Sequence, residues 1–300
     1  MSVYPKAIQL IEVGPRDGLQ NEKSILPTAV KVTFIKKLIA AGLKEIEVGS
    51  FVNPKWVPQM ADTEAVVKAL GPAPAGVTYV ALVPNEKGFE SALRCGIKKI
   101  AVFTAASEAF NQKNINCSIA ESIARFTPVL ELAKKEGVAV RGYVSTAFSC
   151  PYSGDVSSNT VADVVQKLID LGLTDISIGD TTGKAVPTMV AQLLESLIAK
   201  HGSGRFAMHF HDTYGTALAN IVESMRLGID RFDSSAGGLG GCPYAPGASG
   251  NVATDDLVWL VERMGIQTHV GALALQAASL YIQNQLQKKL PSKQLSLLSI

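Results

Sequence analysis

The chain has 300 residues, of which 47% are hydrophobic, 18% charged and 6% aromatic, and its formal net charge is +2. This apolar content supports a sizeable core, and a near-neutral charge without a basic run argues against a nucleic-acid surface. No apolar run approaches the ~20 residues of a membrane-spanning helix. The first residues show no targeting pattern, and the four cysteines are widely spaced without a C-x-x-C pair. We therefore expect a cytoplasmic protein.

One pattern recurs along the chain: a helical stretch ends in glycine, and a short apolar run rich in β-branched residues follows. A glycine at this position supplies the left-handed residue that ends a helix, and the short apolar run is typical of a buried parallel strand. Eight such strands are predicted, at Gln9–Gly14, Glu45–Phe51, Thr78–Val83, Lys99–Thr104, Ala139–Ser145, Asp175–Asp180, Arg205–His211 and Arg231–Ser235. Helical patterns separate them, as in the apolar face formed by Phe34, Ile35, Leu38 and Ile39.

Eight strands alternating with helices predict an α/β fold, a closed (β/α)8 TIM barrel that forms one domain over residues 1–300. Val270–Lys288 is expected to be an additional C-terminal helical segment. A doubly wound open sheet is the alternative, weakened because no dinucleotide-binding glycine motif opens the first helix. Four strand-to-helix connections are long, at residues 52–62, 105–118, 147–159 and 236–251. These connections lie at the C-terminal face of a barrel, where active sites form.

Two histidines in the seventh predicted strand indicate a metal site. His209 and His211 are two residues apart, so their side chains point to the same face of the strand. With the carboxylate of Asp17 at the end of another strand, they suit an octahedral N/O site for a divalent metal, Mg²⁺ or Mn²⁺. The alternative is a pair of core histidines bonded to the backbone. His201 and His269 are expected to be solvated.

Three more charged residues lie at or near strand ends. Arg16 precedes Asp17, and the pair is either a surface ion pair or a metal-binding carboxylate beside a guanidinium that stabilises an enolate or carboxylate oxygen. Glu47 lies within an apolar strand and must be paired, most simply with Arg16. Its role is either catalytic or supportive. Asp180 ends the sixth strand and is either a turn former or a site residue.

The connection over residues 236–251 contains six glycines, two prolines and one cysteine, Cys242, and no charged residue. It is either only a flexible loop or a lid that delivers a thiol to the barrel mouth. Cys95, Cys117 and Cys150 lack this setting, and we interpret them as structural or incidental.

These residues belong to longer stretches that resemble the 3-hydroxy-3-methylglutaryl-CoA lyase family, within the metal-dependent lyases and synthases built on a TIM barrel. The resemblance runs from Ile8 to Leu286 and is strongest over residues 12–22, 46–52, 54–60 and 238–253. The last stretch, GLGGCPYAPGASGNVA, is similar to the active-site cysteine signature of the lyases. Related condensing synthases share the Arg-Asp-Gly and His-x-His elements but lack this cysteine loop.

The resemblance implies a role for each matching residue. The implied metal ligands are Asp17, His209, His211 and Asn251. The implied catalytic residues are Cys242 as proton donor, Arg16 as the enolate-stabilising group, and Glu47 and Asp180. Ser50 and Arg16 are expected to bind substrate, and Asn114 does so within residues 113–117, which resemble part of a coenzyme A pocket.

The implied reaction is cleavage of 3-hydroxy-3-methylglutaryl-CoA to acetoacetate and acetyl-CoA, with an acyl-CoA as the small-molecule partner and no nucleic acid or membrane. The general base is Asp180 or a metal-site histidine. Three alternatives stay open: a lyase for a related 3-hydroxyacyl-CoA, an acetyl-CoA-dependent condensing synthase, and a non-catalytic metal-binding barrel. The chain ends resemble a bacterial-type cytoplasmic enzyme without transit peptide or peroxisomal signal. A homodimer or higher homo-oligomer is compatible with the sequence, which does not decide the oligomeric state.

Overall fold

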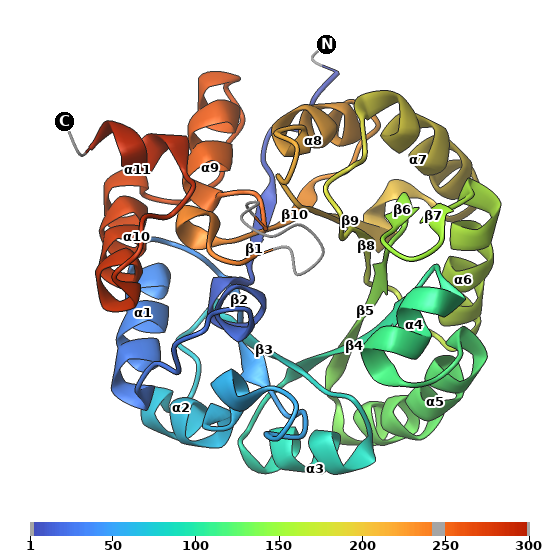
Figure 1. Ribbon diagram of the computed structural model, residues 1–300, viewed down its shortest axis with the longest axis horizontal. Helices are drawn as coiled ribbons and strands as arrows, with labels where there is room; N and C mark the ends of the chain where they lie inside the picture. The colour runs from blue at the N-terminus through green and yellow to red at the C-terminus, as the bar shows by residue number, and fades with distance from the viewer. Residues whose placement is uncertain (1–2, 242–249, 299–300) are drawn as a thin grey trace.

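The computed structural model of the chain describes residues 3–241 and 250–298 and contains a closed barrel of parallel strands (Figure 1). Neighbours around the barrel follow the order β1-β10-β9-β8-β5-β4-β3-β2. The barrel strands are β1 (Gln9–Glu12), β2 (Glu45–Ser50), β3 (Thr78–Leu82), β4 (Lys99–Ala105), β5 (Ala139–Ser145), β8 (Ile176–Asp180), β9 (Phe206–Phe210) and β10 (Arg231–Ser234). Each coincides with a predicted strand to within two residues at either end, so the TIM-barrel prediction is confirmed and the open-sheet alternative is wrong.

Helices surround the barrel on its outside (Figure 1). One follows each strand: α1 (Thr28–Ala40), α2 (Thr63–Leu70), α3 (Glu86–Arg94), α5 (Ile119–Glu136), α6 (Ser158–Asp170), α7 (Pro187–His201), α8 (Ala217–Arg226) and α9 (Thr254–Arg263). Two more helices, α10 (Ala272–Leu286) and α11 (Lys293–Leu297), form the additional C-terminal segment that was predicted. Helix α10 packs against α1, so the last part of the chain lies beside the first helix.

The apolar faces predicted from periodicity are buried against the strands. In α1, Phe34, Ile35 and Leu38 are buried and Ile39 packs partly buried against them. Short apolar strands and one apolar stripe per helix are enough to fill the layer between barrel and helices. The structure also contains no helix, within its described residues, that is long and apolar enough to cross a membrane.

Two of the long connections hold secondary structure that the sequence patterns do not indicate. The connection after β4 contains α4 (Glu108–Ile115), and the one after β5 contains a two-stranded hairpin, β6 (Ser149–Cys150) with β7 (Gly154–Asp155). Helix α4 is set by a local cap, because the Ser107 side chain accepts from the backbone N–H of Phe110. Such short elements carry too few residues for a periodic signal. A five-residue π-helical turn, η1 (Gly14–Gly18), follows β1, and a short 3₁₀ turn, η4 (Ala236–Gly238), follows β10.

Candidate active site

The predicted metal ligands come together at the C-terminal end of the barrel strands. Asp17 lies on η1, directly after β1, and His209 and His211 lie at and just beyond the end of β9. Asn251 follows β10 and forms an isolated antiparallel bridge with His211. Parallel strands bring their carboxyl ends to one face of the barrel, and this is why residues more than 190 positions apart become neighbours.

Asp17, His209 and His211 each present a ligand atom, and these atoms lie within 4.8 Å of one another. The Asn251 side-chain amide donates a 2.8 Å hydrogen bond to the Asp17 carboxylate, which places Asn251 at the edge of the cluster. Two buried atoms there, Oδ1 of Asn251 and Nδ1 of His211, have no hydrogen-bond partner among the described residues. Buried polar atoms almost always have a binding partner, so two atoms without one are typical of a site that binds an ion. Two imidazoles, a carboxylate and an amide oxygen form a ligand set that can bind a divalent metal ion.

The electrostatic setting gives Asp17 and His211 the protonation states that a metal requires. Burial acts to raise the pKa of Asp17, but the charges of Arg16, His209 and His211 outweigh it and lower the pKa to about 2. Burial, together with the neighbouring charge of His209, lowers the pKa of His211 to about 4. Asp17 is therefore ionised and His211 neutral at neutral pH, as metal ligands must be.

A buried carboxylate, Asp233 on β10, orients His209. Its Oδ2 lies 3.2 Å from Nδ1 of His209 and accepts a 2.8 Å bond from the Ser177 hydroxyl. Its Oδ1 accepts from Arg141, which is itself buried. Burial acts to lower the pKa of His209, but the hydrogen bond and the negative charge of Asp233 outweigh burial and raise it. An acceptor at Nδ1 leaves Nε2 of His209 free for a metal, the usual arrangement behind a ligating histidine. Asp233 is not among the predicted site residues, although it is a carboxylate in a buried strand, the same signal that identified Glu47.

Arg16 is fixed between two carboxylates. Its Nε donates to Oε2 of Glu47 at 2.6 Å, and its Nη1 donates to Oδ1 of Asp17 at 2.7 Å. The predicted pairing of Glu47 with Arg16 is therefore confirmed. Burial disfavours the charge of Arg16, but Glu47 and Asp17 outweigh it and raise its pKa. Burial raises the pKa of Glu47 despite Arg16. The guanidinium also lies 5.7 Å from the centre of the Tyr143 ring, so it is held as a permanent, oriented charge beside the cluster.

Asp180 faces the turn that follows it. Its Oδ2 accepts from the backbone N–H of Ala185 at 2.9 Å, and its Oδ1 accepts from that of Lys184 at 3.2 Å and from the Thr182 hydroxyl at 3.4 Å. Burial raises its pKa to about 6 in spite of these donors. The contacts are those of a turn former, and the raised pKa is what a general base near neutral pH needs.

We expect Asp180→Asn to separate these two roles. The asparagine leaves one backbone N–H of the turn without an acceptor, so the free energy of unfolding falls by about 1–3 kcal/mol. If Asp180 only forms the turn, kcat falls by less than about tenfold; a base role lowers it by about 10²-fold or more. Chemical denaturation and steady-state kinetics on the same preparation measure both quantities. Unchanged stability would contradict the turn assignment.

The remaining predicted site residues have different settings. Ser50 ends β2, and its buried hydroxyl has no hydrogen-bond partner among the described residues. Asn114 lies exposed on α4, and none of the hydrogen bonds found in residues 3–241 and 250–298 joins it to the metal cluster. Cys242 lies outside the described residues. The segment leading to it packs beside the site, because a Cβ on Gly18 of η1 would lie 3.0 Å from the Leu239 oxygen.

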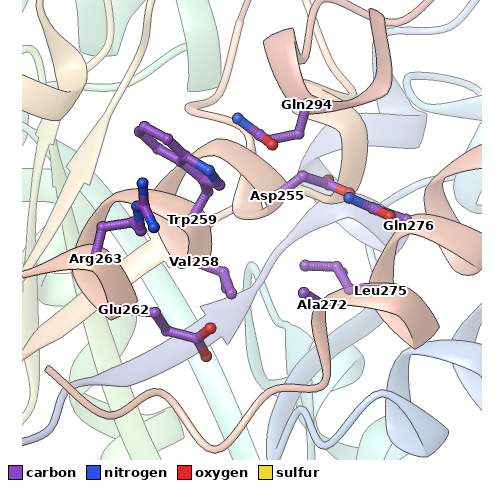
Figure 2. Close-up of a pocket in the computed structure, with 9 residues that line it drawn as sticks. All are labelled: Asp255, Val258, Trp259, Glu262, Arg263, Ala272, Leu275, Gln276 and Gln294. Carbon is purple, nitrogen blue, oxygen red and sulfur yellow. The ribbon is translucent and has the colours of Figure 1, made fainter. Parts of the chain in front are cut away.

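A separate pocket of about 110 Å³ lies among α9, α10 and α11 (Figure 2). Trp259, Arg263 and Gln276 line it with six other residues, and the metal-cluster residues are not among them. The described lining contains no histidine or cysteine. The pocket is therefore distinct from the metal cluster at the barrel mouth.

Comparisons with known proteins show the family to which the chain belongs. The HMGL-like family profile matches residues 7–282. The 3-hydroxy-3-isohexenylglutaryl-CoA/hydroxymethylglutaryl-CoA lyase of Pseudomonas aeruginosa is 54% identical over 271 residues, 90% of each chain. The crystal structure of Bacillus subtilis HMG-CoA lyase superposes with a TM-score of 0.97 at 47% identity, covering 99% of both chains. An HMG-CoA lyase from Acinetobacter baumannii, in complex with coenzyme A and 3-methylmalate, gives 0.92 at 36% identity, covering 98% of this chain and 95% of that one. By sequence and by fold, the chain belongs to the HMGL-like family.

Proposed function

We propose that this chain is a carbon–carbon lyase that cleaves 3-hydroxy-3-methylglutaryl-CoA into acetoacetate and acetyl-CoA. The observation that carries the proposal is the position of Arg16 against the Asp17–His209–His211 cluster. A fixed positive charge next to two imidazoles and a carboxylate supports a reaction that forms an enolate beside a divalent metal. The identity to the Pseudomonas lyase, 54% over 90% of the chain, supports the same assignment.

The reaction breaks the bond between C2 and C3 of the acyl group. The tertiary hydroxyl on C3 gives up its proton and becomes the ketone of acetoacetate, while C2 leaves as the enolate of acetyl-CoA and takes up a proton. Asp17, His209, His211 and Asn251 would hold Mg²⁺ or Mn²⁺, and the metal would supply a positive charge that lowers the pKa of the substrate hydroxyl. The residues of the chain must therefore supply a base, a charge for the enolate oxygen and a proton for C2.

Arg16 supplies the charge, because its guanidinium is oriented in advance by Glu47 and Asp17 and does not reorganise during the reaction. Cys242 supplies the proton to C2 from the glycine-rich connection. Asp180 or a metal-site histidine takes the hydroxyl proton. Ser50 and Asn114 bind the substrate, and the coenzyme A bound by the Acinetobacter lyase supports an acyl-CoA here.

Purified protein is expected to release acetoacetate from 3-hydroxy-3-methylglutaryl-CoA when Mg²⁺ or Mn²⁺ is present, and to stop when a chelator is added. Acetoacetate is measured by a coupled dehydrogenase assay. Cys242→Ala is the matched variant, with Cys95→Ala as the control thiol. Intact metal-loaded protein that releases no acetoacetate would overturn the substrate assignment, and full activity in Cys242→Ala would overturn the role of the thiol.

A second substrate follows from the name of the Pseudomonas relative, which includes the 3-hydroxy-3-isohexenylglutaryl thioester. The same assay with that thioester compares kcat/KM between the short and the long acyl chain. An assay in the direction of carbon–carbon bond formation tests the condensing synthase. A cytoplasmic location and a homodimeric or higher state stay predictions, and light scattering measures the latter.

A further inference from the structure

Glu12, the last residue of β1, is a fully buried carboxylate that the proposed reaction does not use. Its Oε1 accepts two backbone N–H bonds, from Gly14 and from Ala236, each at 2.9 Å. Its Oε2 accepts a 2.8 Å bond from the Thr254 hydroxyl. Three donors in a buried position hold the carboxylate in one orientation.

The three donors belong to three segments that surround the metal cluster. Gly14 begins η1, the turn that carries Asp17. Ala236 begins η4, and Thr254 begins α9, three residues after Asn251. Glu12 therefore joins the segment that carries the carboxylate ligand to the segment that carries the amide ligand.

Further contacts show that these segments rest on one another beside the cluster. The Asn251 amide donates a 2.8 Å hydrogen bond to the Asp17 carboxylate and a 3.3 Å hydrogen bond to the backbone oxygen of Leu239. Leu239 lies one residue beyond η4. A Cβ on Gly14 would lie 2.5 Å from Oε1 of Glu12, so η1 approaches the carboxylate as closely as only glycine allows. A small displacement of any one segment thus moves the Asp17–Asn251 pair.

Closure of the barrel does not require the side chain of Glu12. Strands β1 and β10 are paired from Gln9↔Arg231 to Glu12↔Ser234, and the backbone N–H of Val13 bonds the Ser234 oxygen at 2.9 Å. Because strand pairing already fixes the backbones of β1 and β10, the hydrogen bonds of the Glu12 carboxylate act on the segments that follow the two strands.

We propose that Glu12 is a positioning residue, which holds η1, η4 and the start of α9 in the arrangement that brings Asp17 and Asn251 together as metal ligands. The proposal rests on the proposed function only in identifying that site as a metal site. Its test therefore measures metal affinity, which does not depend on the substrate.

The test compares three variants by Mn²⁺ titration calorimetry on the full chain. Glu12→Ala removes all three acceptor bonds, and we expect Mn²⁺ affinity to fall by about tenfold or more. Glu12→Gln keeps an oxygen that accepts from the backbone N–H groups of Gly14 and Ala236. The Thr254 hydroxyl then donates to the Ser234 hydroxyl, 2.9 Å away, and accepts a hydrogen bond from the new amide. We expect Glu12→Gln to bind Mn²⁺ within about threefold of the parent chain. Thr254→Val removes one bond at constant size and should give a smaller loss in the same direction.

Glu45→Ala is the matched control. Glu45 is also a buried carboxylate on a barrel strand, but it begins β2, at the end of the strand away from the metal cluster. It binds Gln9 and Lys99, at 3.0 and 2.6 Å, and its 3.5 Å contact with Arg141 is made by a different nitrogen from the one that binds Asp233. We expect this variant to lose stability with unchanged Mn²⁺ affinity.

Kinetics provides a second measurement. In Glu12→Ala, kcat with 3-hydroxy-3-methylglutaryl-CoA at saturating Mn²⁺ should fall by about 10²-fold, because a displacement near 1 Å has that effect. The proposal is overturned if folded Glu12→Ala, or folded Thr254→Val where the alanine variant does not fold, binds Mn²⁺ as the parent does. The proposal is also overturned if Glu45→Ala weakens Mn²⁺ binding as much as Glu12→Ala does. A Glu12→Gln variant that binds Mn²⁺ as weakly as Glu12→Ala would overturn it too. Inactive parent protein that binds Mn²⁺ would refute the proposed function while leaving this test intact.

Discussion

Replacing Arg16 by methionine is expected to lower kcat for acetoacetate release by about 10²- to 10³-fold, the usual effect of removing one preorganised donor from a developing oxyanion. The side chain has similar length, so packing beside Tyr143 is retained while the charge is lost. KM should change less than kcat, since the interaction strengthens as charge develops on the enolate. Steady-state kinetics with saturating Mn²⁺ measures both constants.

The same substitution leaves Glu47 without its partner. Glu47 is fully buried, and its other carboxylate oxygen, Oε1, has no partner among the described residues. Breaking a buried ion pair from one side costs about 3–5 kcal/mol, so Arg16→Met alone should unfold at a lower denaturant concentration. Arg16→Met/Glu47→Gln removes the unpaired charge and should recover most of that stability.

This double variant separates catalysis from folding. If Arg16 acts on the enolate, the double variant is stable but as inactive as Arg16→Met. Recovery of activity together with stability would assign Arg16 a purely structural role and contradict the prediction. Arg16→Lys is the conservative comparison, and we expect it to be impaired because one ammonium cannot reproduce the two directed bonds to Glu47 and Asp17.

The barrel was predictable because its strands are short apolar runs set off by glycine, and each pattern is local. Gly42 shows the principle: its φ of +103° ends α1, and a Cβ there would lie 2.4 Å from the His269 oxygen. Helix α4 and the β6–β7 hairpin were missed because two to eight residues carry no reliable period. Their positions depend on local bonds, such as the one from the Ser107 hydroxyl to the thiol of Cys150.

The gathering of Asp17, His209 and His211 was predictable for a different reason. Parallel barrel strands end on one face, so polar residues at strand ends become neighbours even without a contact map. Of the supporting carboxylates, Glu47 was predicted, but Asp233 and Glu12 were not. Asp233 reaches Arg141 across 92 residues, and Glu12 reaches Ala236 across 224, and such pairs follow from register and not from any local pattern.

His211→Ala is expected to weaken Mn²⁺ binding by about 10²-fold and to abolish acetoacetate release at micromolar metal. His211 is buried, its pKa is lowered to about 4, and its Nδ1 has no partner in the described chain, so its imidazole is neutral and available through the neutral pH range. Its ring lies beside that of His209, with the ring centres 5.2 Å apart, so the substitution removes one of two neighbouring imidazoles. The affinity is measured by calorimetry after the protein has been stripped with EDTA.

Thermal unfolding gives a measurement of the same site without any substrate. A ligand that binds only the folded chain stabilises it by about 2.7 kcal/mol at a hundredfold excess over Kd, so Mn²⁺ should raise the Tm of the parent chain and EDTA should reverse the rise. In His211→Ala the Tm should not respond to Mn²⁺ at the same concentration. His201→Ala is the control, because His201 lies at the end of α7 with its ring against Phe206, and it should keep the full response. Equal responses in His211→Ala and the parent would place the metal elsewhere, and a response lost in both variants would point to damage to the fold and not to the loss of a ligand.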